Sequence, residues 1–197
     1  MAKLYFSYSA MNAGKSTLLL QASYNYEERG MRTLLMTSSF DDRVGKGVIA
    51  SRIGLKREAE LFNPGLDLFE FLRAKSSQGR VDCAFVDEAQ FLSEEQVWQL
   101  GRVADELKVP VMCYGLRTDF QGKLFPGRKA LLALADALRE ISTICWCGKT
   151  ATMVVRLDGE GTIIEDGEQI VIGGEDSYVS LCRKHWSSRK IGPDPKA

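Results

Sequence analysis

Apolar residues in the first part of the chain gather in short runs, and segments with helical spacing of apolar residues separate them. The apolar runs cover residues 3–8, 33–37, 81–86, 109–116 and 140–144, and the helical segments cover residues 17–28, 66–72, 93–107 and 127–138. Strands that alternate with helices in this way predict a parallel sheet covered by helices on both faces. The chain is therefore expected to have an α/β fold.

Turn and cap residues mark the ends of several of these segments. Ser93 with Gln96 three positions later predicts a capping box at the start of a helix. The Asn-Pro-Gly sequence at residues 63–65 predicts a turn, and three glycines between residues 45 and 54 predict a loop-rich stretch.

The pattern changes at Cys145, where short β-type runs replace the strand and helix alternation. These runs cover residues 152–157, 162–165 and 169–172, and Asp-Gly, Glu-Gly and Gly-Gly pairs separate or follow them. We therefore expect an α/β domain over residues 1–142, a small β-rich domain over residues 143–190 and a flexible tail over residues 191–197.

Residues 9–16, Ser-Ala-Met-Asn-Ala-Gly-Lys-Ser, lie between the first expected strand and the first expected helix, as a phosphate-binding P-loop does. Gly14 lets the backbone approach a phosphate, Lys15 supplies a positive charge and the Ser16 hydroxyl can bind Mg²⁺. Ser9 stands at the first glycine of the motif, where a positive φ would be less comfortable. A nucleoside triphosphate is the expected ligand, and an ordinary turn into a helix is the alternative.

Two acids, Asp87 and Glu88, follow the apolar run at residues 83–86, as at the end of a Walker B strand. Successive strand residues point to opposite sides, so the two carboxylates need not share a task. Asp87 is the expected Mg²⁺ partner and Glu88 the expected general base, whereas a solvated helix N-terminus is the alternative. The candidate nucleotide-binding residues are Ser9, Ala10, Met11, Asn12, Ala13, Gly14, Lys15, Ser16, Asp87, Glu88, Ala89 and Gln90.

Thiol and imidazole side chains in two short pairs suggest a tetrahedral zinc site. The four candidate ligands are Cys145, Cys147, Cys182 and His185, the last being the single histidine of the chain. No position in this set is open to water, so the zinc would be structural; a histidine used only for packing is the alternative. Cys83 and Cys113 lie in apolar runs and are expected to be buried packing residues.

Charge and length exclude several classes of protein. The 197 residues contain 26 Lys and Arg and 26 Asp and Glu, so the net charge is zero, which argues against nucleic acid as the main partner. No apolar run is long enough to cross a membrane and no signal peptide precedes the first strand, so we expect a cytoplasmic protein with no membrane partner. Five cysteines in a reducing compartment favour thiols or metal ligands over disulfides.

Taken together, these motifs resemble the type II thymidine kinases, a family of zinc-bearing P-loop deoxynucleoside kinases. The resemblance covers nearly the full chain and rests on residues 9–17, 87–91, 114–116, 119–120 and 172–174, the four metal ligands and Tyr178. The sequence departs from many members at Ser9 and in the Cys-x-Cys pair with His185, where they have glycine and four cysteines.

The resemblance implies a RecA-like sheet and a zinc-held domain whose lasso loop closes over thymidine. It implies ATP with Mg²⁺, a homotetramer, and Glu88 as the base for the 5′-hydroxyl. The substrate-binding residues that it implies are Phe120, Gln169, Ile170, Val171, Ile172, Gly173 and Tyr178. Two other classes stay open at this point: a RecA-like ATPase in which Glu88 activates water, and a zinc-ribbon binding module that senses nucleotide.

Overall fold

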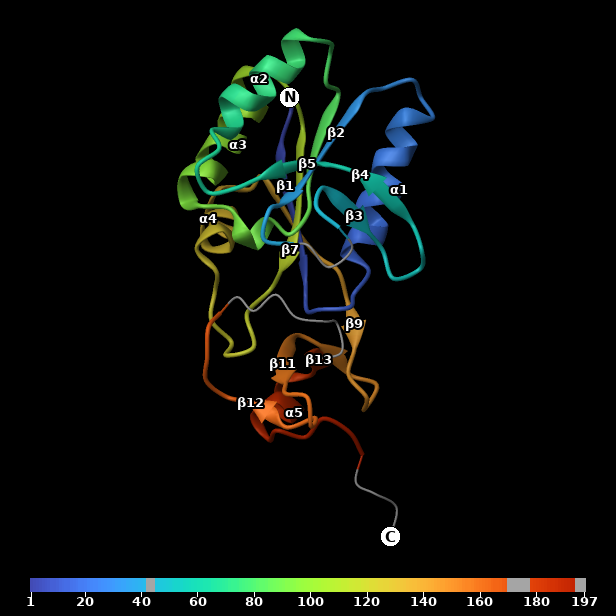
Figure 1. Ribbon diagram of the computed structural model, residues 1–197, viewed down its shortest axis with the longest axis vertical. Coiled ribbons are helices and arrows are strands. Elements are labelled where there is room, and N and C mark those ends of the chain that lie inside the picture. The colour runs from blue at the N-terminus through green and yellow to red at the C-terminus, as the bar shows by residue number, and fades with distance from the viewer. Residues whose placement is uncertain (42–44, 170–177, 194–197) are drawn as a thin grey trace.

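The structure is a computed structural model that describes residues 1–41, 45–169 and 178–193. Figure 1 shows a larger part, in which helices flank a sheet, and a smaller part of short strands beneath it. Within the described residues, none of the helices is both long and apolar enough to span a membrane.

The larger part is built on a six-stranded sheet in the order β5-β2-β6-β7-β1-β8, and every neighbouring pair is parallel. Its strands are β1 (Leu4–Ser9), β2 (Thr33–Ser38), β5 (Glu60–Phe62), β6 (Cys83–Val86), β7 (Val111–Leu116) and β8 (Ala137–Glu140). The predicted α/β fold with a parallel sheet is confirmed.

Helices cover both faces of this sheet. They are α1 (Lys15–Glu27), α2 (Leu68–Ser77), α3 (Glu94–Glu106) and α4 (Pro126–Leu134), with a short 3-10 helix, η1 (Ala89–Phe91), after β6. In Figure 1, α1 lies on one side of the sheet and α2, α3 and α4 lie on the other. The capping box of α3 is present as predicted, since Ser93 and Gln96 exchange side-chain to backbone hydrogen bonds.

The two faces of the sheet carry separate apolar cores, which explains why its strands have continuous apolar runs. Phe85 packs with Leu19 and Leu35 on the α1 side, and its neighbour Val86 packs with Leu100 on the other side. Because successive strand residues point to opposite faces, a strand buried on both faces needs apolar residues at every position.

The helix predicted over residues 127–138 ends earlier, at Leu134. The backbone N–H of Asp136 donates to the Leu4 carbonyl at 2.9 Å, and the Asp136 carboxylate accepts from the Leu4 N–H at 2.8 Å. These bonds place the next residues beside β1, where they form β8. The strand predicted over residues 140–144 was also wrong, since Glu140 ends β8 and Thr143–Ile144 form β9 in another sheet.

The stretch between β2 and β5, predicted as loop, contains an antiparallel hairpin of β3 (Val48–Ala50) and β4 (Lys56–Glu58). Ile49 is the buried residue of β3 and packs with Leu19 and Leu20 of α1. One buried residue among polar neighbours leaves no apolar run, so the sequence pattern missed these strands.

The described residues of the smaller part form a three-stranded antiparallel sheet, a two-stranded sheet and a short helix. Its elements are β9 (Thr143–Ile144), β10 (Thr150–Ala151), β11 (Met153–Leu157), β12 (Ile163–Ile164), β13 (Tyr178–Leu181) and α5 (Arg183–Ser187). It is joined to the larger part by hydrogen bonds from Ser180 Oγ to the Met11 carbonyl at 2.6 Å and from Trp186 Nε1 to the Phe120 carbonyl at 3.2 Å. Residues 170–172 of the predicted strand 169–172 lie outside the described residues.

The start of α4 provides a test of this packing. A Cβ at Gly127 would lie 2.1 Å from the carbonyl oxygen of Leu92, so Gly127→Ala should lower the free energy of unfolding by about 1–3 kcal/mol. Gly101 in α3 has no such neighbour, so Gly101→Ala should raise the free energy of unfolding by about 0.5–1 kcal/mol. Denaturant unfolding of both variants measures the difference, and equal values would contradict this account of the α4 contact.

Candidate active site and metal site

The loop between β1 and α1 has the backbone geometry of an anion-binding site. Gly14 is the N-cap residue of α1 with φ 81°, and Asn12 also has a positive φ of 61°. No side chain caps the first turn of α1, and this turn contains no acidic residue. Its backbone N–H groups and the positive end of the helix dipole are thus directed at a phosphate position.

Ser9 ends β1 and is not among the described residues with positive φ, so its side chain causes no backbone strain. Its hydroxyl donates to the Ala10 carbonyl at 2.7 Å and accepts from Lys15 Nζ at 3.2 Å. Lys15 Nζ also donates to the Ala10 carbonyl at 3.3 Å, and the lysine is only 8% exposed. The serine that replaces the expected glycine therefore helps to hold the ammonium group of the P-loop lysine.

The two acids after β6 reach the P-loop from the neighbouring part of the sheet edge. Ser16 Oγ donates to Asp87 Oδ2 at 2.9 Å, and the Glu88 N–H donates to Asp87 Oδ1 at 3.0 Å. Glu88 has a left-handed backbone, with φ 51° and ψ 38°, a conformation that costs free energy in a residue with a side chain. Because the chain turns here, both acids line one cleft and do not point to opposite faces as in a strand.

Gln90 positions Glu88. Its side-chain amide donates to Glu88 Oε2, and its Oε1 accepts from the Leu116 N–H at 3.0 Å. Gln90 is 1% exposed and Ala89 is fully buried, so both lie behind the cleft wall. Both residues are among the candidates for nucleotide binding that were predicted from the sequence. The amide thus links the candidate base to the end of β7.

The environment of Asp87 favours its protonated form. Burial of the carboxyl group, followed by the negative charge of Glu88, raises the pKa of Asp87 from 3.8 to about 7, although Ser16, the Glu88 N–H and Lys15 act in the opposite direction. A divalent cation at this position would displace the proton and restore the carboxylate. The hydroxyl and carboxylate oxygens of Ser16 and Asp87 are ligands that suit Mg²⁺.

The cleft has a volume of about 240 Å³ and joins the P-loop, the acids and the β3–β4 hairpin. It is lined by Met11, Asn12, Ala13, Gly14, Lys15, Ser16, Thr17, Asp41, Ala50, Ser51, Arg52, Ile53, Asp87, Glu88 and Leu116. Most of the P-loop residues predicted from the sequence thus meet the two predicted acids. The hairpin residues 50–53 and Asp41 were not predicted, because their part of the chain has no motif.

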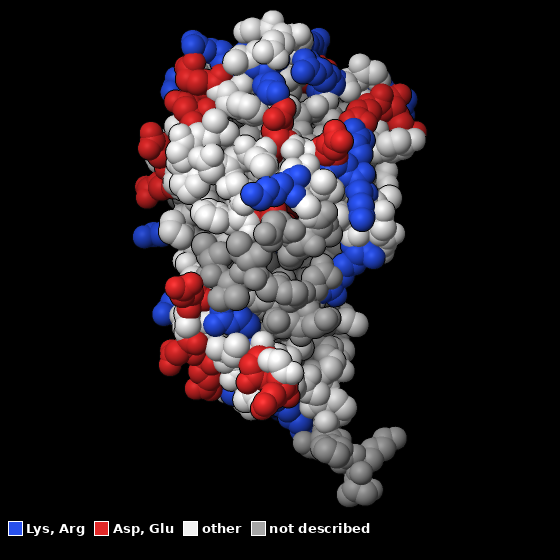
Figure 2. Space-filling view, viewed as in Figure 1, with Lys and Arg blue, Asp and Glu red and all other residues white. Residues whose placement is uncertain are grey.

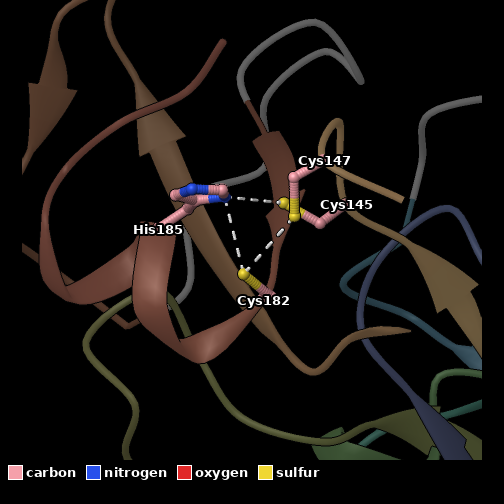
Figure 3. A group of neighbouring side chains, drawn as sticks. All are labelled: Cys145, Cys147, Cys182 and His185. Atoms are coloured by element: carbon pink, nitrogen blue, oxygen red, sulfur yellow. Dashed lines mark hydrogen bonds between the residues drawn. The ribbon is translucent and has the colours of Figure 1, made fainter. Parts of the chain in front are cut away.

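The four candidate metal ligands come together in the smaller part, as Figure 3 shows. Cys145 and Cys147 come from the turn between β9 and β10, and Cys182 and His185 from the start of α5. The ligand atoms all lie within 4.8 Å of one another. The Cys145 and Cys182 Sγ atoms are 3.4 and 3.5 Å from His185 Nδ1, and the Cys147 and Cys182 Sγ atoms are 3.9 Å apart.

These distances fit one tetrahedral metal ion. With Zn–S bonds of about 2.3 Å, two sulfur ligands of a tetrahedral zinc are about 3.8 Å apart. The His185 ring also stacks on Trp146, with 4.2 Å between ring centroids, which fixes its orientation. Three thiols and an imidazole leave no open position, so the site suits a structural ion. Cys83 and Cys113 are buried, and burial raises the pKa of Cys83 to about 12, as expected for packing thiols.

Among the residues expected to bind the second substrate, Phe120 and Gln169 lie where the two parts meet. Phe120 is 3% exposed and has the Arg156 guanidinium over its ring, 4.2 Å from the centroid. Gln169 Nε2 donates to Asp119 Oδ2 at 2.7 Å, and Tyr178 is the first residue of β13. Four further candidates lie outside the described residues: Ile170, Val171, Ile172 and Gly173. Arg156 and Asp119 were not among the sequence-based candidates.

Similarity to known proteins extends over nearly the whole chain. The family described as thymidine kinase matches residues 2–186. The thymidine kinase of Agrobacterium fabrum is 64% identical over 94% of this chain and 96% of its own length. The thymidine kinases of Ruegeria pomeroyi and Rhizobium meliloti are 63% and 62% identical, over 100% and 96% of this chain and 98% of their own lengths. The matched residues include the P-loop, both acids and all four metal ligands.

The metal site predicts a specific metal content. Purified protein should contain about one zinc ion per chain, and the double variant Cys182→Ala with His185→Ala should contain none, because two ligands cannot hold the ion. Cys83→Ala should keep its zinc, because this thiol lies in the core of the larger part. Elemental analysis measures the content, and zinc retained by the double variant would rule out this ligand set.

Because the pKa of Asp87 is raised, the free energy of unfolding should depend on pH when neither Mg²⁺ nor nucleotide is bound. The folded protein binds this proton more tightly than the unfolded chain, so Asp87 should lower the free energy of unfolding as the pH rises from about 4 to about 7. Asp87→Asn should therefore be more stable than the native protein at pH 8, by on the order of a few kcal/mol, and should lose this advantage below about pH 4.

Denaturant unfolding without added Mg²⁺ or nucleotide tests this expectation across the pH range. Asp105→Asn is the matched control, because Asp105 is exposed and its loss should not change the pH profile. An Asp87→Asn variant that is less stable than the native protein at pH 8 would contradict the expectation.

Proposed function

Because this chain belongs to the thymidine kinase family, we propose that it transfers the γ-phosphoryl group of ATP to the 5′-hydroxyl of thymidine, giving dTMP and ADP. The single observation that carries the proposal is the position of Glu88. It lines the same cleft as the P-loop, and Gln90 holds its carboxylate. A base beside the expected position of the terminal phosphate suits transfer to an alcohol.

The P-loop binds the donor. The backbone N–H groups at the start of α1 would bind phosphate oxygens, and Lys15 would turn its ammonium group from the Ser9 hydroxyl and Ala10 carbonyl towards the phosphates. Phosphoryl transfer passes through a loose transition state with charge spread over the phosphoryl oxygens. Alignment and charge stabilisation by these groups therefore supply most of the rate acceleration.

Ser16 and Asp87 would hold the Mg²⁺ that accompanies ATP. Their oxygen atoms are 2.9 Å apart, and both can turn towards one cation. Bound Mg²⁺ would neutralise charge on the phosphate oxygens. Loss of the Asp87 proton on cation binding would give the carboxylate that the metal requires.

Glu88 accepts the proton of the nucleoside hydroxyl. As the O5′–H bond breaks, O5′ forms a bond to the γ-phosphorus, and the bond from this phosphorus to the bridging oxygen of ADP breaks. The hydrogen bond from Gln90 and the left-handed backbone at Glu88 hold the carboxylate in the cleft. The packing of the surrounding structure compensates for that backbone strain.

Phe120, Gln169 and Tyr178 would bind the nucleoside, together with residues 170–173. This assignment is supported by the hydrogen bond from Gln169 to Asp119, the residue next to Phe120. The bond joins Gln169, which directly precedes residues 170–173, to the larger part. The zinc ion would hold the two ends of this loop region, because two ligands precede it and two follow it. The same proposal includes domain limits at residues 142 and 190, a homotetramer, a cytoplasmic location and the lack of a nucleic-acid partner.

One assay tests the function. With γ-labelled ATP and Mg²⁺, the label should move to dTMP only when thymidine is present. Release of labelled phosphate without thymidine would instead indicate an ATPase, and ATP binding without any product would indicate a nucleotide-sensing module. Either result would contradict the proposed kinase.

The same assay tests Glu88. Glu88→Gln should keep ATP binding and lose most of its turnover, by about 10²–10⁴-fold, because the amide is nearly isosteric but cannot accept the proton. Glu95→Gln removes an exposed carboxylate from α3 and should be as active as the native protein. Native turnover in Glu88→Gln would remove Glu88 from the mechanism.

A further inference from the structure

The β3–β4 hairpin contributes a wall of the cleft to which no part of the mechanism has yet been assigned. Residues 50–53, at the end of β3 and in its turn, line the same cleft as the P-loop. The turn is ordered by its own hydrogen bonds, from the Ser51 N–H to the Leu55 carbonyl at 2.8 Å and from the Leu55 N–H to Ser51 Oγ at 3.0 Å. The hairpin therefore presents this turn to the cleft in one arrangement.

Two contacts hold the hairpin on α1, the helix that begins in the P-loop. Ile49 is 2% exposed and packs against Leu19 and Leu20. At the other strand, the Arg57 guanidinium donates to both carboxylate oxygens of Glu27, at 2.9 and 2.8 Å, and these bonds lower the pKa of Glu27. The P-loop and the hairpin turn are thus fixed relative to each other through one helix (Figure 1).

Charged side chains of both signs line the cleft. Its described lining contains three carboxylates, Asp41, Asp87 and Glu88, and two cations, Lys15 and Arg52. The two cations come from different elements, because Lys15 belongs to the P-loop and Arg52 to the hairpin turn. Arg52 is exposed, and Figure 2 shows basic side chains along the edge where Figure 1 places the hairpin and α1.

We propose that Arg52 binds the terminal phosphoryl group of the donor nucleotide from the hairpin wall of the cleft. This inference rests on the proposed function and assigns a catalytic residue to it. The P-loop, the two acids and the hairpin turn line one cleft, and Arg52 is the cation that the hairpin turn contributes to this lining. A guanidinium suits this position, because its planar fork of donors can bind two phosphoryl oxygens at once.

Arg52 would act mainly in the transition state. Charge spreads over the three phosphoryl oxygens as the bond to ADP breaks, and a donor that meets this charge lowers the barrier. The bonds that form and break are those already given for the transfer, and Arg52 loses no proton.

The test compares Arg52→Gln with Lys56→Gln, which removes the same charge from an exposed position of β4 outside the lining of the cleft. Titration calorimetry with Mg²⁺ and no thymidine gives the Kd for ATP and for ADP. Arg52→Gln should weaken ATP binding by about 10-fold or more, with less than about a two-fold change for ADP. Its kcat should fall by about 10²–10³-fold, and Arg52→Lys should recover part of it. Lys56→Gln should match the native protein in all three measurements.

Three results would overturn the assignment: native ATP affinity and kcat in Arg52→Gln, equal losses for ATP and ADP, or the same losses in Lys56→Gln. The last would indicate a general effect of surface charge. Zinc content and unfolding free energy equal to those of the native protein show that each variant is folded. Failure of the native protein to form dTMP would contradict the proposed function instead, while the comparison of ATP with ADP would still decide the role of Arg52.

Discussion

The hydrogen bond between Ser16 and Asp87 joins two parts of the chain that are 71 residues apart, and the active site depends on it. It exists because β1 and β6 are parallel strands of one sheet, so that their carboxyl ends meet at the same edge. The P-loop that follows β1 and the acids that follow β6 are thereby brought to one cleft. Each of these segments alone would be an ordinary loop at the end of a strand.

The same edge of the sheet carries two features that are unfavourable for stability. Asp87 is buried next to Glu88, and Glu88 has a left-handed backbone. Both features cost stability, and the surrounding core on the two faces of the sheet compensates for them. Both features lie beside the P-loop, where they suit a site that binds a cation at Asp87 and accepts a proton at Glu88. A site that had only to be stable without nucleotide would need neither feature.

The junction of the two parts brings the P-loop and a residue proposed to bind the second substrate into contact with the smaller part. Ser180 contacts the P-loop through the Met11 carbonyl, and Trp186 contacts the Phe120 carbonyl, so the metal-bearing part touches both the donor loop and an expected nucleoside residue. The buried Arg156 lies over Phe120 and donates to the Glu168 carbonyl at 2.9 Å. The four candidate metal ligands thus lie in a part of the protein that contacts both the P-loop and Phe120.

The sequence by itself determined the elements whose physics is local or periodic. Continuous apolar runs indicated strands buried on both faces, Ser93 and Gln96 marked the start of α3, and residue type and spacing identified the P-loop, the acids and the metal ligands. Only the tertiary structure decided where α4 ends, because hydrogen bonds to Leu4 override helical spacing there. It also decided that residues 48–58 form a hairpin on α1 and that Arg52 lines the cleft. These features depend on contacts between residues far apart in the chain, and one buried isoleucine or one exposed arginine leaves no pattern in the sequence from which such contacts could be predicted.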